Sequence, residues 1–205
     1  MHGASSQWIG VDIWTDALER ARRKIEALGV RNATVKEADA ASMPFADRSF
    51  DLITSNLGIN NFADLPAVMR ECARVARPEA RVVLTTNITG HMAEMYDILR
   101  ALARDHVAAI DHQQRHRGTL ESISKLLSHS GFSVARTVRR DFALNFVDGS
   151  AMLRHSFMRW FIDDWRVAIG PKDEREVFTE VERRLNESGP LQLTIPALYI
   201  EAVRR

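Results

Sequence analysis

Hydrophobic and polar residues along the first half of the chain predict strands and helices in alternation. An apolar stretch at residues 8–12 precedes a segment at 17–28 whose apolar residues recur at helical spacing. The other elements expected in this half are strands at 33–39, 50–56 and 80–87 and a helix at 65–77. This alternation predicts an α/β fold, with a mostly parallel sheet that carries helices on both faces.

The second half of the chain is richer in predicted helix. Helices are expected at 91–105, 119–131, 149–170 and 171–188, strands at 132–146 and 191–205, and a polar loop at 111–118. No Gly/Ser-rich linker, low-complexity run or internal repeat separates the two halves. We therefore expect one domain over residues 1–205, with a helical elaboration between its last two strands.

Composition narrows the class of protein. The chain has 205 residues, 45% hydrophobic and 27% charged, which is typical of a globular domain. The formal net charge of +1 gives no electrostatic reason to expect nucleic acid as a partner. No apolar run is long enough to span a bilayer, so we expect no membrane span. The single cysteine, Cys72, fits a buried helix position better than a nucleophile, and it suits a reducing, cytoplasmic location.

Polar side chains end several of the predicted strands. Asp12, Asp39 and Asn56 each end or follow one, so all three should lie along the carboxyl edge of the sheet, where such sheets bind ligands. A carboxylate at the position of Asp12 can accept hydrogen bonds from both hydroxyls of a ribose. The same carboxylate would also suit a purely structural role at the start of the following helix.

Three stretches taken together indicate a family. They are IGVDIWTDALERAR, KEADAASMPFADRSFDLITSNLGINNF and RECARVARPEARVVLTT, all between residues 9 and 86. They resemble the class I S-adenosylmethionine-dependent methyltransferases, in the branch of the ubiquinone/menaquinone C-methyltransferases. The middle stretch is the most specific: an acid and Ala, then Met-Pro-Phe, then Ser-Phe-Asp opening a strand. The rest of the chain resembles the family in general plan, with late helices and an antiparallel C-terminal strand pair.

The resemblance implies a cofactor, a reaction and a set of roles. The cofactor would be S-adenosylmethionine, and the reaction an in-line methyl transfer to a small-molecule acceptor. By position, Asp12 would bind the ribose hydroxyls, Ile13 would lie against the adenine, and Asp39 would accept from the adenine amino group. The backbone of Ala40 would contact the adenine ring, and Asn56 would face the methionine part. Residues 1–110 would then form the cofactor-binding half and residues 111–205 the substrate side.

One part of the family pattern is missing. The resemblance places a strand and a GxGxG loop before the ribose acid, and this chain has no such glycine-rich loop there. We expect the first strand and first helix of the fold to be absent. Three explanations stay open: a truncated N-terminus, a partner chain or homo-oligomer that completes the sheet, or direct pairing of strands 8–12 and 50–56.

The sequence is also compatible with other functions and contains other candidate sites. A degenerate methyltransferase fold that acts as a non-catalytic binding or regulatory subunit stays open, and a nicotinamide-dependent oxidoreductase lacks its GxGxxG motif. His112 and His116 have helical spacing, but no carboxylate or cysteine completes a metal site. His91 and Tyr96 follow a strand near the expected acceptor, although the sequence does not identify a catalytic base. The aromatic segment 155–165 suits either an apolar substrate pocket or ordinary helix packing.

Overall fold

The computed structural model describes residues 6–115 and 117–205. The strands are β1 (Trp8–Asp12), β2 (Ala33–Glu37), β3 (Phe50–Asn56), β4 (Ala76–Asn87), β5 (Phe132–Phe146) and β6 (Leu191–Arg204). The helices are α1 (Thr15–Ala27), α2 (Leu65–Val75), α3 (Ala93–Leu102), α4 (Val107–Arg115), α5 (Leu120–His129), α6 (Gly149–Arg154), α7 (Arg159–Ile169) and α8 (Glu174–Glu187). Short 3₁₀ turns lie at Ile59–Asn61, Arg104–His106 and Ser156–Met158. Over the described ranges, no helix is both long and apolar enough to cross a membrane.

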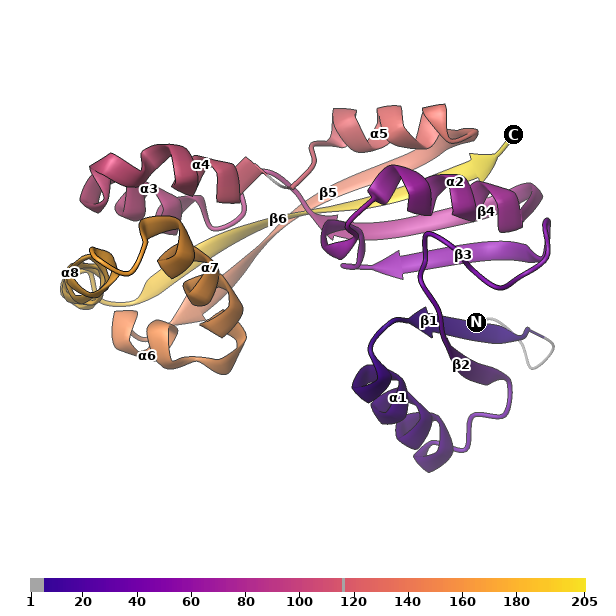
Figure 1. Ribbon diagram of the computed structural model, residues 1–205, viewed down its shortest axis with the longest axis horizontal. Coiled ribbons are helices and arrows are strands. Elements are labelled where there is room, and N and C mark those ends of the chain that lie inside the picture. Colours follow the sequence, from indigo (N-terminus) through magenta and orange to yellow (C-terminus); the bar gives the residue numbers. More distant parts are fainter. Residues whose placement is uncertain (1–5, 116) are drawn as a thin grey trace.

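The main sheet has four strands in the order β3-β4-β6-β5. β3 and β4 are parallel, and β6 runs antiparallel to both of its neighbours. The antiparallel C-terminal pair expected from the sequence is therefore present. Helices α2 and α5 lie together over one side of this sheet (Figure 1). The fold is α/β as expected, although half of the strand pairings in the described residues are antiparallel.

β1 and β2 form a separate two-stranded parallel sheet. The helix between them, α1, closes with Gly29 at a φ of 63°, where glycine avoids the steric penalty of other residues. β1 does not pair with β3, so the predicted alternative of direct pairing between these strands is wrong. In Figure 1 β1 lies below β3 and both strands point the same way, towards the helical half of the molecule.

Two hydrophobic clusters hold the rest of the molecule together. One joins α2 and α5 to the main sheet, with Val82, Leu84 and Phe132 almost completely buried. The other joins α3, α4, α6, α7 and α8 around Trp165. β5 and β6 take part in both, because their paired length runs past the end of β4 into the helical group (Figure 1).

Two local expectations differ from the structure. Helix α2 ends at Val75, before Pro78, and the following residues bulge out of the β3–β4 ladder before regular pairing resumes at Arg81. The predicted polar loop at 111–118 is helical as far as Arg115, because α4 extends into it. Its polar residues are held from the side: Arg100 on α3 donates from Nε to Asp111 at 2.7 Å.

Candidate functional site

The carboxyl end of β1 presents an accessible carboxylate. Asp12 is exposed and accepts a hydrogen bond from the backbone N–H of Trp14 at 3.0 Å, which fixes the turn into α1. Its backbone oxygen accepts from Ala38 N–H at 3.0 Å, so the end of β1 is tied to the residue after β2. Ile13 follows with 63% of its surface exposed. A short acceptor and an apolar side chain are therefore displayed side by side at this edge.

Asp39 lies in the loop that leaves β2. It is exposed, and its Oδ1 accepts from Ala41 N–H at 2.8 Å. Ala40 and Ala41 are partly buried and pack against the cluster of the main sheet. The Asp39 loop therefore bridges the small sheet and the large one.

Helix α2 fixes the far side of the same loop. Arg74 donates to the backbone oxygens of Phe45 at 2.8 Å and Met43 at 3.0 Å. Glu71 accepts from Met43 N–H at 2.7 Å and from Arg74. The hydrogen bond from Arg74 lowers the pKa of Glu71 below its usual value, against the opposing effect of burial. The loop that carries Asp39 is thus held by ionised, charge-assisted bonds.

Asn56 ends β3, on the main sheet. Its side-chain oxygen accepts from the hydroxyl of Thr85 on β4, which fixes the amide orientation. Leu57 has a φ of 58°, and a Cβ added at Gly58 would lie 2.7 Å from the Ser55 hydroxyl. A larger residue at position 58 would require the Ser55 hydroxyl to move, and the sharp turn at the end of β3 is made at Leu57.

The structure brings four of the five predicted cofactor residues together. Asp12, Ile13, Asp39 and Ala40 lie at the carboxyl edge of the β1–β2 pair, joined by the hydrogen bond between Ala38 and Asp12. Asn56 lies at the corresponding edge of the main sheet, which is not hydrogen-bonded to that pair in the described residues. The exposed acceptors suit the hydroxyls and amino group of a nucleoside, so the described residues fit that part of S-adenosylmethionine.

Comparison with known proteins shows similarity to methyltransferases. Residues 1–84 match the family described as "Methyltransferase domain". The chain is 33% identical over 81 residues to a demethylmenaquinone methyltransferase of Anoxybacillus flavithermus, a match that covers 40% of this chain and 34% of that protein. It is 23% identical over 215 residues to the nocamycin O-methyltransferase of Saccharothrix syringae, covering 97% of this chain and 76% of the relative. Its match thus spans about a third of the length of the demethylmenaquinone methyltransferases.

Solved structures agree on the fold. The YcgJ protein of Bacillus subtilis superposes with a TM-score of 0.62 at 19% identity, covering 98% of this chain and 83% of that one. The chain therefore has the fold of these solved structures, one of which is a putative methyltransferase of Bacillus halodurans.

A cluster of aromatic and polar side chains lies in the helical half of the molecule, after the end of β4. It comprises His91, Tyr96, Arg117, Phe161 and Trp165, from the segment after β4, from α3, from the α4–α5 connection and from α7. The Phe161 ring lies 5.3 Å from the His91 ring, 5.7 Å from the Arg117 guanidinium carbon and 6.3 Å from the Trp165 ring. The Tyr96 ring packs edge-on against Trp165 at 5.8 Å.

Arg117 is the member of this cluster that sequence reasoning missed. It is 9% exposed, and burial lowers the pKa of its guanidinium, while Tyr96 and Asp164 oppose that shift. Nothing in the sequence separates Arg117 from the exposed Arg115 two residues earlier. Only the packing of α7 over the α4–α5 connection distinguishes them.

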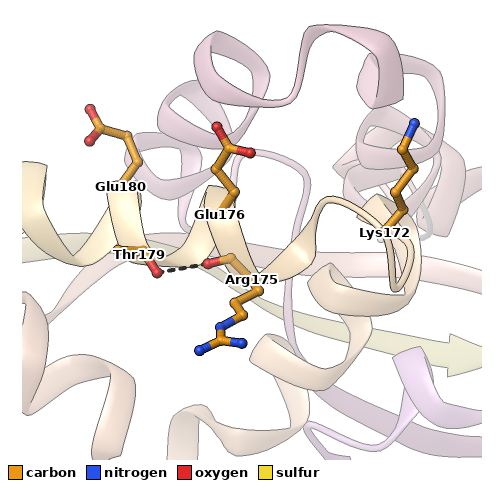
Figure 2. A pocket seen from close by; sticks show the side chains of 5 residues that line it. All are labelled: Lys172, Arg175, Glu176, Thr179 and Glu180. Carbon is orange, nitrogen blue, oxygen red and sulfur yellow. Dashed lines mark hydrogen bonds between the residues drawn. The ribbon is translucent and has the colours of Figure 1, made fainter.

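The other polar features of this methyltransferase fold do not form a comparable site. A hollow beside α8 is lined by Lys172, Arg175, Glu176, Thr179 and Glu180, and Figure 2 shows Lys172 on the turn before the helix and the other four side chains along α8. Across residues 6–115 and 117–205 no group of three or more metal-ligating side chains comes together. His112 is exposed on α4, and His116 lies outside the described residues.

Cys72 is a core residue of α2. It is 6% exposed within the main-sheet cluster, and burial raises the pKa of its thiol to about 12. A thiol that stays protonated at neutral pH is a poor nucleophile, so the prediction of a packing role is supported.

Proposed function

We propose that this chain binds S-adenosylmethionine and transfers its methyl group to a small-molecule acceptor. The proposal is carried by one observation: an exposed Asp12 carboxylate at the carboxyl end of β1, next to the Asp39 loop, in a segment that matches a methyltransferase family. The overall match to an O-methyltransferase and the N-terminal match to demethylmenaquinone methyltransferases both support methyl transfer. The names of these relatives indicate different methyl acceptors, so the small-molecule acceptor of this chain belongs to the proposal.

The residues of this chain would bind and orient rather than act as reagents. Asp12 would accept hydrogen bonds from the two ribose hydroxyls, and Asp39 and the backbone of Ala40 would hold the adenine, with Ile13 covering its face. Asn56, held by Thr85, would face the methionine part. When bound, S-adenosylmethionine supplies an electrophilic methyl on a sulfonium, which an acceptor lone pair attacks in line as the carbon–sulfur bond breaks.

Titration calorimetry with S-adenosylhomocysteine tests the cofactor site. We expect saturable binding to the 205-residue chain and a loss of roughly 10- to 100-fold in Asp12→Ala, which removes a charged acceptor of two hydrogen bonds. Asp16→Ala is the matched control, because Asp16 is an exposed acid in the first turn of α1. Equal affinity for wild type and Asp12→Ala would refute the ribose role.

Absence of binding by the folded chain would favour the second function, a non-catalytic binding or regulatory subunit. That result would also favour a further strand, from a partner chain or a second copy, between β1 and β3. The cytoplasmic location stays a prediction.

A further inference from the structure

Two buried side chains in the helical half of the molecule, Arg117 and Trp165, each have an N–H without a hydrogen-bond partner. Arg117 is 9% exposed, and its Nε–H has no hydrogen-bond partner. The indole N–H of Trp165, which is 1% exposed, also has none. Buried donors without partners are rare in folded proteins, and they are usually explained by function or by a bound group.

No carboxylate neutralises this guanidinium at ion-pair distance among the described residues. Tyr96, which also forms a hydrogen bond with the guanidinium, and Asp164 both favour its charged form, but no salt bridge between Asp164 and Arg117 is found in the part of the chain that is described. The face of the Phe161 ring, 5.7 Å away, provides only a cation–π contact. A positive charge and two N–H donors are therefore left available to an anionic oxygen group.

The walls around these donors are aromatic. Phe161 and Trp165 lie 6.3 Å apart with an interplanar angle of 37°, and Tyr96 stands edge-on to Trp165. On the outer side Phe157, which is 52% exposed, lies 5.7 Å from Phe161. Aromatic surface thus runs from solvent to the buried guanidinium, which suits a flat, unsaturated body behind the anionic group.

The same cluster is tied to the edge of the sheet that carries the predicted cofactor residues. The hydroxyl of Thr89 donates to the backbone oxygen of Arg117 at 2.8 Å, and its N–H donates to Gly118 at 3.1 Å. Thr89 follows the end of β4 by two residues, and β4 pairs with β3 up to Asn56. A ligand on Arg117 would therefore lie beyond the carboxyl ends of these strands.

We infer that the Arg117 cluster binds the methyl acceptor, and that the acceptor is a planar organic anion, an aromatic or conjugated carboxylate. The role of the bound anion as methyl acceptor rests on the proposed function. The binding of the anion itself does not depend on that function. Arg117 and the indole N–H of Trp165 hold the carboxylate, and Phe161 and Tyr96 enclose the flat body.

The test compares acids with their uncharged amides on matched variants. Benzoate, cinnamate, benzamide and cinnamamide are titrated calorimetrically into wild type, Arg117→Met and Arg115→Met, with and without S-adenosylhomocysteine. We expect wild type and Arg115→Met to bind at least one acid at least tenfold more tightly than its amide. Arg117→Met should lose at least tenfold in acid affinity and no more than twofold in amide affinity. Arg117→Lys keeps the positive charge and should keep the preference for acids over amides. This variant replaces Arg117→Met in the comparison if the Met variant does not fold.

Several results would overturn the inference: binding of neither acid to wild type, equal affinities for acids and amides, or unchanged acid affinity in Arg117→Met. The two proposals fail separately. Acid binding that depends on Arg117 without any S-adenosylhomocysteine binding would refute the methyltransferase proposal and leave an organic-anion site. If S-adenosylhomocysteine binds and Asp12→Ala abolishes that binding, but no acid binds, the anion site is refuted and the methyltransferase proposal is kept.

Discussion

The β1–α1–β2 segment depends on very little buried surface, so the Leu18→Ala variant should loosen this segment and leave the main sheet folded. Leu18 is 2% exposed and is the one apolar side chain classed as buried among the described residues of these three elements. α1 has 13 residues, a length at which an isolated helix is marginal in water. The segment should therefore depend on Leu18 for its local stability.

The expected loss follows from the cavity that alanine leaves. Leu-to-Ala changes in cores lose about 2–5 kcal/mol, and the partly open surroundings of Leu18 place it near 2 kcal/mol. That loss corresponds to roughly a 30-fold rise in local opening. Asp12 lies in this segment and Asp39 lies next to it. The affinity for S-adenosylhomocysteine should therefore fall as local opening of the segment increases.

Hydrogen exchange followed by mass spectrometry measures this effect region by region. We expect faster exchange in peptides from residues 8–37 and little change in β4 and β6. Leu127→Ala is the matched control, because Leu127 is fully buried under the main sheet and its loss should speed exchange there. Uniformly faster exchange across both sheets in Leu18→Ala would show that the segment folds with the rest, contrary to this reasoning.

Two further predictions concern α2. At pH 8 Cys72 should resist a thiol reagent such as dithiobisnitrobenzoate in the native protein and react at once in urea, because burial raises its pKa to about 12; fast native labelling would contradict its burial. The folded pKa of Glu71 is lowered, so its contribution of about 1 kcal/mol should be present at neutral pH and disappear as the pH falls from about 4.5 through that lowered value. Urea unfolding of wild type and Glu71→Gln at pH 7, 5, 4 and 3 measures this, and a stability difference independent of pH would contradict it.

Local pattern was enough to predict most of the elements. The stretch 132–146 was predicted as a strand from its alternating residues and forms β5 over that range, although most of its side chains are exposed. The segment 111–115 was wrongly predicted as loop. Its polar residues looked like loop residues, but Arg100 and the buried Ile110 stabilise it as helix.

Other features depend on contacts between distant parts of the chain. The Asp39 loop could be predicted from its motif, but the anchoring of that loop by Arg74 could not, since the two lie more than thirty residues apart. Arg117 has no signature at all in the sequence, because its burial comes from the packing of α7. The separation of the two sheets likewise appears only when the strand pairings are known.

The long antiparallel β5–β6 pair connects the two halves of the molecule and sets the distance between them. β4 stops pairing with β6 at Ala197, and β6 continues away from it, paired to β5, back to Leu191. At about 3.4 Å per residue, this overhang extends the paired strands roughly 20 Å past the end of β4, and the helical group packs along it. Continuous strands have no hinge, so the spacing between the sheet edge and the helices is set by strand length. An acceptor that reaches from one to the other would then be selected by its own length as well as by its chemistry.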